Sequence, residues 1–273
     1  MQQMDSFINK AGWSVAARMT LPADAGRHFP PEDLPLGEPA KAYLRAAAPS
    51  GLYLHQRKAL ERFAAGNNVC LATGTASGKS LSFYAAAIEL LASEPAARVL
   101  VMYPLKALGS EQEERWKQAL AAGGLQAEAG RIDGQVRVHA RAAILKSCRV
   151  VVMTPDVVHA WLLSNLADSA VSRFLRRVKL IIVDEIHTYS GVFGSNAAFL
   201  FRRLRHVLSI LGAAPRFICA SATVADPAEH TRQLFSVPFD VIGRENDTSP
   251  KHEVDVCFLR PPRSADLLSE TAG

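Results

Sequence analysis

The feature that most constrains the fold of this chain is an alternation of short apolar runs with longer helix-like stretches between residues 52 and 241. The apolar runs have the length of buried strands and lie at 68–72, 98–103, 150–153, 180–183 and 216–220. Helix-like stretches lie at 55–65, 79–92, 106–121, 157–166 and 194–211. Apolar runs separated by helices are typical of a parallel sheet that is covered on both faces. The sequence therefore predicts an α/β domain of three layers.

The two ends of the chain differ from this alternating part. Residues 1–50 contain repeated prolines, which leave room only for short helices such as 40–47. We expect residues 1–50 to form an N-terminal arm that packs on a domain spanning 51–245. Residues 246–273 contain one strand-like run, 254–259, and then a polar end. We interpret 246–273 as the start of a connection to a further domain.

Composition narrows the class of protein. The 273 residues are 49% hydrophobic and 21% charged, which supplies a core and argues against a disordered chain or a coiled coil. No apolar stretch reaches the roughly 18 to 20 residues that span a bilayer, and the N-terminus does not resemble a signal peptide. The four cysteines form no closely spaced pair, so they indicate neither zinc nor redox chemistry. We therefore expect a cytoplasmic protein without a membrane partner.

The net charge of +5 is compatible with a polyanionic partner but does not require one. Basic residues cluster at 173–179 and at 202–205. Their helical spacing fits a solvated, salt-bridged face as well as a stripe that binds nucleic acid. The sequence leaves both readings open.

A phosphate-binding loop is the first chemical signal. Residues 73–80 read Thr-Gly-Thr-Ala-Ser-Gly-Lys-Ser, directly after an apolar run and before a helical stretch. Such a junction points backbone N–H groups and a helix N-terminus at a phosphate chain. Thr73 stands where the strict pattern has a glycine, and a chance Gly-Lys-Ser at a helix start is the alternative reading. The residues expected to bind the phosphates are Thr75, Ala76, Ser77, Gly78, Lys79 and Ser80, with the Ser80 hydroxyl on Mg²⁺.

Two adjacent acids, Asp184 and Glu185, directly follow the apolar run 180–183. The carboxyl ends of parallel strands are where α/β sheets bind ligands. Asp184 could hold Mg²⁺, and Glu185 could orient the water that attacks the γ-phosphate. A surface acid pair is the alternative, which the upstream phosphate loop disfavours.

Together these segments resemble superfamily 2 helicases of the DEAD/DEAH type, which are ATPases built on two RecA-like lobes. The loop 73–80 resembles motif I, residues 184–187 (Asp-Glu-Ile-His) resemble motif II, and 221–223 (Ser-Ala-Thr) resemble motif III. Shorter similarities cover the Q motif at 53–56, motif Ia at 103–108, motif Ib at 133–134 and a TPD-like motif at 153–156.

A narrower resemblance is to the MrfA/Hrq group, through 73–80, 184–195 and 217–223. This group contains DNA repair helicases that move 3′ to 5′ and carry a zinc-binding C-terminal domain. The resemblance implies an ATP-dependent DNA helicase or translocase that uses ATP and Mg²⁺, binds single-stranded DNA and acts in DNA repair.

The resemblance also implies roles for individual residues. Gln56 would hydrogen-bond the edge of adenine, and Lys79, Asp184 and Glu185 would carry out ATP hydrolysis. Residues that would couple the nucleotide site to the nucleic-acid site are His187, Ser221 and Thr223. Residues that would hold the backbone of a single DNA strand are Pro104, Lys106, Thr154 and Pro155. Ordinary structural roles stay open for His187, Ser221, Thr223 and Lys106, and Phe193 is read as a packing residue or a stacking residue.

No segment after Thr223 resembles the motifs of a second RecA-like lobe. We therefore expect the first motor lobe of a longer helicase, whose second lobe lies in the same polypeptide. Such a lobe by itself should be nearly inactive, because an arginine supplied across the cleft is worth roughly 10³ to 10⁵ in rate. A stand-alone ATP-binding regulatory subunit and an RNA-dependent ATPase are the alternative functions.

Overall fold

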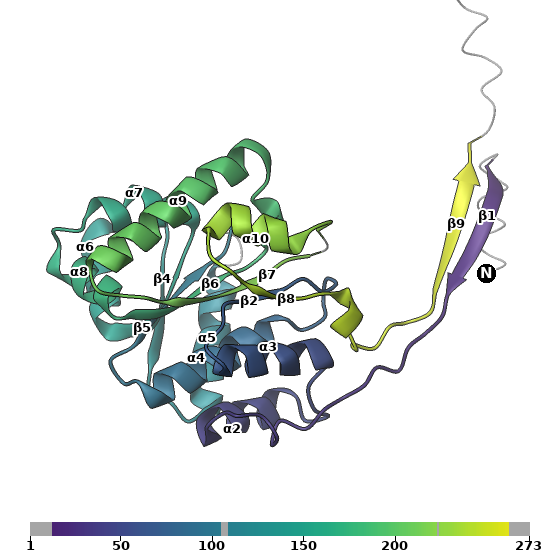
Figure 1. The fold of residues 1–273 in the computed structure, drawn as a ribbon, viewed down its shortest axis with the longest axis horizontal. Helices are drawn as coiled ribbons and strands as arrows, with labels where there is room; N and C mark the ends of the chain where they lie inside the picture. Colours follow the sequence, from purple (N-terminus) through teal and green to yellow (C-terminus); the bar gives the residue numbers. More distant parts are fainter. Residues whose placement is uncertain (1–12, 105–108, 223, 262–273) are drawn as a thin grey trace, which may run out of the picture. The chain divides into compact units, whose positions relative to one another are not determined.

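The computed structural model describes residues 13–104, 109–222 and 224–261 (Figure 1). It contains two compact units, one spanning Arg27–Thr248 and one formed by the chain ends, up to Gly26 and from Ser249 onward. The larger unit extends beyond both of the boundaries expected at residues 50 and 245. Those functional boundaries stay predictions, because compactness by itself does not define a functional domain.

A parallel sheet of seven strands, in the order β4-β5-β3-β6-β7-β2-β8, forms the centre of the larger unit. The five apolar runs between residues 68 and 220 that predicted strands all lie in this sheet. The strands β4 and β8 were not predicted, because β4 is a sheet-edge strand containing Gly130 and Arg131, and β8 is only three residues long. The strand bounds are β2 Val69–Leu71, β3 Arg98–Met102, β4 Glu128–Ile132, β5 Cys148–Met153, β6 Val178–Val183, β7 Arg216–Ala220 and β8 Asp240–Ile242.

Helices cover both faces of the sheet, so the predicted three-layer α/β fold is confirmed (Figure 1). Successive residues of one strand enter opposite cores: Leu71 and Val101 face one helical layer, whereas Cys70 and Met102 face the other. One layer consists of α2 Glu38–Ala47, α3 Leu54–Ala64, α4 Ser80–Ser93 and α5 Gly109–Ala122. The other consists of α6 Val138–Ser147, α7 Pro155–Ala160, α8 Ser169–Arg176, α9 Gly191–Ile210 and α10 Pro227–Phe235.

Two of these helices carry the basic clusters. On α8, Val171 and Phe174 are buried while Arg173 and Arg176 are exposed, so the charged side chains lie on the outer face of the helix. On α9, Arg205 donates to the backbone oxygens of Phe235 and Ser236 at 2.9 and 3.2 Å. Arg202 likewise reaches the carbonyl of Gln233 and the hydroxyl of Ser236. These arginines satisfy the last carbonyls of α10, which is a structural role.

Part of the expected N-terminal arm belongs to the core of the larger unit. The helix α2 buries Leu44 completely and packs on α4 and α5. Leu34, before this helix, is also buried, with an exposed fraction of 2%. Residues 27–50 therefore contribute to the hydrophobic core and do not merely cover it.

The smaller unit is an antiparallel ribbon of β1 Ser14–Leu21 and β9 Val254–Arg260. The run 254–259 predicted β9, whereas β1 was not predicted. Its pairing, from Ser14 opposite Arg260 to Leu21 opposite Val254, joins segments at opposite ends of the sequence. Over the part of the chain that the structure describes, no helix is both long and apolar enough to cross a membrane.

We expect Leu44→Ala to lower the free energy of unfolding by about 2 to 5 kcal/mol, because it leaves a cavity in a fully buried position. Urea denaturation of the purified chain measures this change. The matched control is Ile210→Ala on α9, where the side chain is 70% exposed and the change should stay within about 0.5 kcal/mol. Equal effects of the two substitutions would contradict the packing of α2 in the core.

Candidate nucleotide and nucleic-acid site

The loop 73–80 joins β2 to α4, and its own side chains fasten it. The Thr73 hydroxyl lies 2.8 Å from the Ser77 hydroxyl, and Ser77 Oγ donates to the carbonyl of Gly74 at 2.9 Å. Both side chains are buried. The threonine in place of the usual first glycine therefore closes the loop through a hydroxyl pair, which glycine could not supply.

The backbone of the loop contains two residues in the left-handed region. The φ angle is 58° at Ala76 and 75° at Gly78. A Cβ atom at Gly78 would also come within 2.8 Å of Gln56 Nε2, so a larger residue there would adopt a strained φ and displace the Gln56 amide. A turn that mixes right- and left-handed residues gathers N–H groups into an anion-binding concavity.

Lys79 lies over this loop. Its Nζ donates to the carbonyls of Thr73 and Gly74 at 3.2 and 2.6 Å. Burial lowers the pKa of Lys79, while the nearby carboxylates of Glu185, Asp184 and Asp247 act in the opposite direction. The lysine is thus a partly buried cation close to three carboxylates.

The N-terminal turn of α3 hydrogen-bonds to the loop from the other side. His55 Nε2 lies 2.9 Å from the carbonyl oxygen of Ser77, and Gln56 Nε2 donates to that of Gly78 at 2.9 Å. Gln56 Oε1 also accepts from the Tyr53 N–H at 2.9 Å. Sequence reasoning named Gln56 and missed His55. The signal that could have found it is its place beside Gln56 within the Q-like segment.

The acid pair lies at the carboxyl end of β6. Asp184 N donates to the carbonyl of Met102 on β3, and Asp184 Oδ1 accepts from Glu185 N at 2.9 Å. Burial, and then the neighbouring Glu185, raise the pKa of Asp184 to about 6. Glu185 has a φ of 51°, a strained value for a residue with a side chain. Backbone strain of this kind clusters at functional sites.

His187 links the acid pair to the segment after β7. Its Nδ1 accepts a hydrogen bond from Ala222 N at 3.1 Å. The same nitrogen also lies 3.2 Å from Glu185 Oε2, so His187 contacts both the acid pair and the segment after β7. The preceding residue, Ser221, is buried and donates its N–H to Leu71 O, directly before the loop. Thr223, the remaining residue of the predicted coupling set, lies outside the described residues.

A cavity of about 510 Å³ opens beside the phosphate loop. Tyr53 and Gln56 line it from α3 and its N-cap, and Gly78 and Ser80 line it from the loop. His28 adds a further ring, 5.1 Å from that of Tyr53. Sequence reasoning missed the contribution of residues 28–51 to this cavity, because nothing local in a proline-punctuated segment indicates a distant contact.

The residues predicted to hold nucleic acid follow the neighbouring strands β3 and β5. Pro104 is the second residue after β3, and Thr154 and Pro155 form the N-cap and first turn of α7 after β5. A hydrogen bond from Tyr103 N to Met153 O, at 3.2 Å, holds the two strand ends together. Lys106 lies outside the described residues. The structure thus brings Pro104 and Thr154 to one edge of the sheet.

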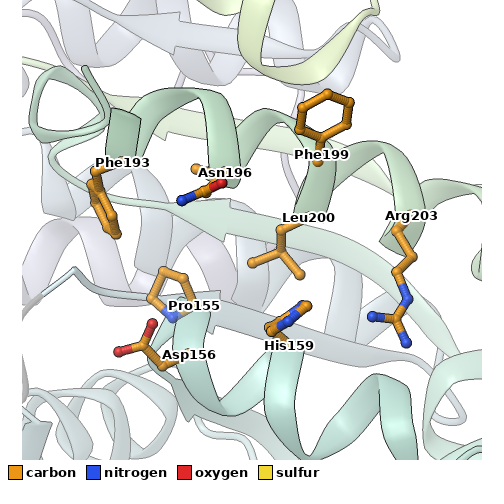
Figure 2. Close-up of a pocket in the computed structure, with 9 residues that line it drawn as sticks. Pro155, Asp156, His159, Phe193, Asn196, Phe199, Leu200 and Arg203 are labelled. Atoms are coloured by element: carbon orange, nitrogen blue, oxygen red, sulfur yellow. The ribbon is translucent and has the colours of Figure 1, made fainter. Parts of the chain in front are cut away.

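A groove of about 450 Å³ runs between α7 and α9, starting at Pro155 (Figure 2). Phe193 lies at the Pro155 end, and Leu200, Phe199 and Arg203 follow along α9. The Phe193 ring stacks on Tyr189, with centroids 5.2 Å apart, and its side chain is 44% exposed. Phe193 is therefore both a packing residue and a wall of the groove.

The geometry agrees with the comparisons to known proteins. The profile of the DEAD/DEAH box helicase family matches residues 53–231. The chain belongs to this family. The matched range contains every motif described above, from the Q-like segment to Ser221.

Among its relatives, the chain is 32% identical to the uncharacterized ATP-dependent helicase YprA of Bacillus subtilis, over 88% of this chain and 31% of YprA. It is 34% identical to the ATP-dependent helicase HRQ1 of Saccharomyces cerevisiae, over 77% of this chain and 20% of HRQ1. The chain therefore spans about a third or less of these relatives.

A solved structure, the DUF1998 helicase MrfA bound to DNA and AMPPNP, superposes with a TM-score of 0.85 at 28% identity. The alignment covers 94% of this chain and 35% of the MrfA chain. The resemblance to the MrfA/Hrq group and the RecA-like fold are thus both confirmed.

The raised pKa of Asp184 predicts how stability depends on pH. The folded protein holds this proton more tightly than the unfolded chain, so the residue lowers stability as the pH rises from about 4 through about 6. We expect Asp184→Asn to raise the free energy of unfolding by about 2 to 3 kcal/mol at pH 8, and by almost nothing near pH 4. Urea denaturation of the ligand-free chain across this range measures the difference.

The control is Asp156→Asn, which changes an exposed carboxylate on α7 and should give no such pH-dependent gain. A lower stability of Asp184→Asn than of the wild type at pH 8 would show that burial of this carboxylate is not costly.

Proposed function

We propose that this chain is the ATP-binding motor lobe of an ATP-dependent DNA helicase or translocase that moves along single-stranded DNA. The observation that carries the proposal is the shared sheet edge. There the phosphate loop with Lys79, the pair Asp184 and Glu185, and the bond from Ala222 to His187 lie together. A motor lobe requires a nucleotide site that is connected to the residues that bind nucleic acid. A regulatory subunit would not need all of these hydrolytic residues.

The residues beside the loop fit ATP. The Gln56 amide uses one N–H on Gly78 and one oxygen lone pair on Tyr53, so one donor and one acceptor remain for the edge of adenine. The aromatic rings of Tyr53 and His28 offer apolar surface to the base in the adjoining cavity. The triphosphate would follow the N–H groups of residues 75–80 and the ammonium of Lys79.

The same edge fits Mg²⁺. Asp184 is a buried carboxyl whose pKa is raised by burial and by Glu185, so a divalent cation would offset an electrostatic cost that already exists. Ser80 at the start of α4 and Asp184 at the end of β6 are the residues that would hold it. When bound, Mg²⁺ neutralises the charge that develops on the phosphates. Glu185 would orient the attacking water.

Single-stranded DNA would lie across the ends of β3 and β5. Pro104, Lys106, Thr154 and Pro155 would contact its backbone, positioning the strand without reading its sequence. DNA is favoured over RNA because the superposed MrfA structure contains DNA. A role in DNA repair follows from the resemblance to the MrfA/Hrq group. An RNA-dependent ATPase is the competing function.

The second half of the ATP site would come from another RecA-like lobe in the same polypeptide. One seven-stranded sheet is present in the described residues, and the relatives are at least about three times longer than the matched region. His187 and the segment 221–223 would transmit the state of the nucleotide to the bound strand. This lobe without its partner lobe should hydrolyse ATP very slowly.

Lys79→Ala should weaken the binding of a fluorescent ATP analogue to the chain about 10- to 100-fold, because it removes charge-assisted bonds to the phosphates. The control, Lys117→Ala, removes an exposed lysine that pairs with Glu113 on α5 and should bind like the wild type. Equal affinities of the two variants would overturn the ATP site.

Glu185→Gln should keep ATP binding and lower the rate of hydrolysis at least about 100-fold, since it removes the group that orients water. The rate is measured in the polypeptide that carries both lobes, with saturating single-stranded DNA. An unchanged rate would show that another group performs this role. Stronger stimulation of the same protein by single-stranded RNA than by DNA would favour the RNA-dependent alternative.

A further inference from the structure

Three consecutive residues at the end of the larger unit each contact the helix α3. Lys58 Nζ donates to Asn246 Oδ1 at 2.6 Å, and Leu54 N donates to Thr248 Oγ1 at 2.9 Å. Between them, Asp247 Oδ1 lies 3.6 Å from His55 Nδ1. We call residues 246–248 the α3 clamp. It begins at the last residue of the short 3₁₀ helix Arg244–Asn246 and contacts the first turns of α3.

The central contact of the clamp is buried. The side chain of His55 is 0% exposed and that of Asp247 is 8% exposed. On the opposite side of the imidazole ring, Nε2 lies 2.9 Å from the Ser77 carbonyl oxygen, which can only accept. Nε2 therefore carries a hydrogen, and Nδ1 faces Asp247 at a distance beyond that of a hydrogen bond. The imidazole ring thus lies packed between the Asp247 carboxylate and the phosphate loop.

Asp247 also lies close to the loop itself. Its Oδ2 is 3.6 Å from the position that a Cβ atom on Gly74 would occupy. The carbonyl of Gly74 in turn accepts from Lys79 Nζ. The clamp thus meets the loop at its beginning, near Gly74, and through His55 at its end, near Ser77.

We propose that Asp247 is a positioning residue that acts through His55 to hold the phosphate loop in its binding shape. This inference rests on the proposed ATP site. Thr248 also donates to the carbonyl of Arg27 at 2.9 Å, so the clamp is anchored on its far side. The next residue, Ser249, begins the other compact unit. The affinity for phosphate should therefore change when residues 246–248 are perturbed. By linkage, phosphate binding should in turn stabilise these residues.

The experiment compares Asp247→Ala and Asp247→Asn with the wild-type chain. We expect Asp247→Ala to weaken binding of mant-ATP about tenfold, because it removes the buried carboxylate packed against His55 and so frees the ring that holds the Ser77 carbonyl. Asp247→Asn keeps the shape and should give a smaller loss. Binding of adenosine, measured by competition with mant-ATP, should stay unchanged, since adenosine does not contact the phosphate loop. The control Glu253→Gln removes one exposed acid and should change neither.

A double variant tests whether Asp247 acts through His55. The loss of mant-ATP affinity in His55→Asn/Asp247→Asn should be no greater than in His55→Asn by itself. Thermal unfolding of each variant checks that the fold is kept. If Asp247→Ala does not fold, Asp247→Asn and the double variant carry the test.

Wild-type affinity for mant-ATP in the folded Asp247 variants would overturn the proposal. So would an equal loss of adenosine binding, which would indicate a general distortion, or additive losses in the double variant. Failure of the proposed ATP site is distinguishable from these results. In that case the wild-type chain would not bind mant-ATP at all, or Lys79→Ala would bind it as well as the wild type.

Discussion

Parallel pairing in the middle of the sheet is the interaction on which the rest of the site depends. β6 lies between β3 and β7, and β2 pairs with β7 in register. Hydrogen bonds continue past the strand ends, from Asp184 N to Met102 O and from Ser221 N to Leu71 O. Because all these strands run in the same direction, their chemically active ends meet at one edge. The alternation of side chains into two cores then fixes the register of each strand and so the position of its end.

The electrostatics of this edge oppose the stability of the fold. Burial raises the pKa of Asp184 and lowers that of Lys79, so neither charged form is fully favourable without a ligand. The left-handed backbone at Glu185 adds strain. A nucleotide with its cation would relieve these costs, because phosphates and a metal supply the opposite charges. The large apolar core beneath the edge supports this arrangement.

The phosphate loop is held from two directions. Inside the loop, Thr73 and Ser77 share a hydroxyl contact, and outside it His55 and Gln56 hold two successive carbonyls. The helix α3 that presents these side chains is in turn contacted by the α3 clamp. Loop shape is therefore a property of the whole lobe. The nearby cavity is likewise built from distant segments, because its walls come from both α3 and residues 28–51.

The sequence by itself determined the parallel three-layer fold, the phosphate loop, the acid pair and the family resemblance, because each depends on local order. Apolar runs report strands, and a motif of eight consecutive residues carries its own geometry. Only the tertiary structure decided which distant residues meet. His55 and Asp247 are separated by 192 positions, since 247 minus 55 is 192. Likewise, β4 lies at a sheet edge and lacks a continuous apolar run. The helix α2 lies in a proline-punctuated segment, and only its packing shows that Leu44 belongs to the core. Periodicity records which side of an element is buried, but not which neighbour buries it.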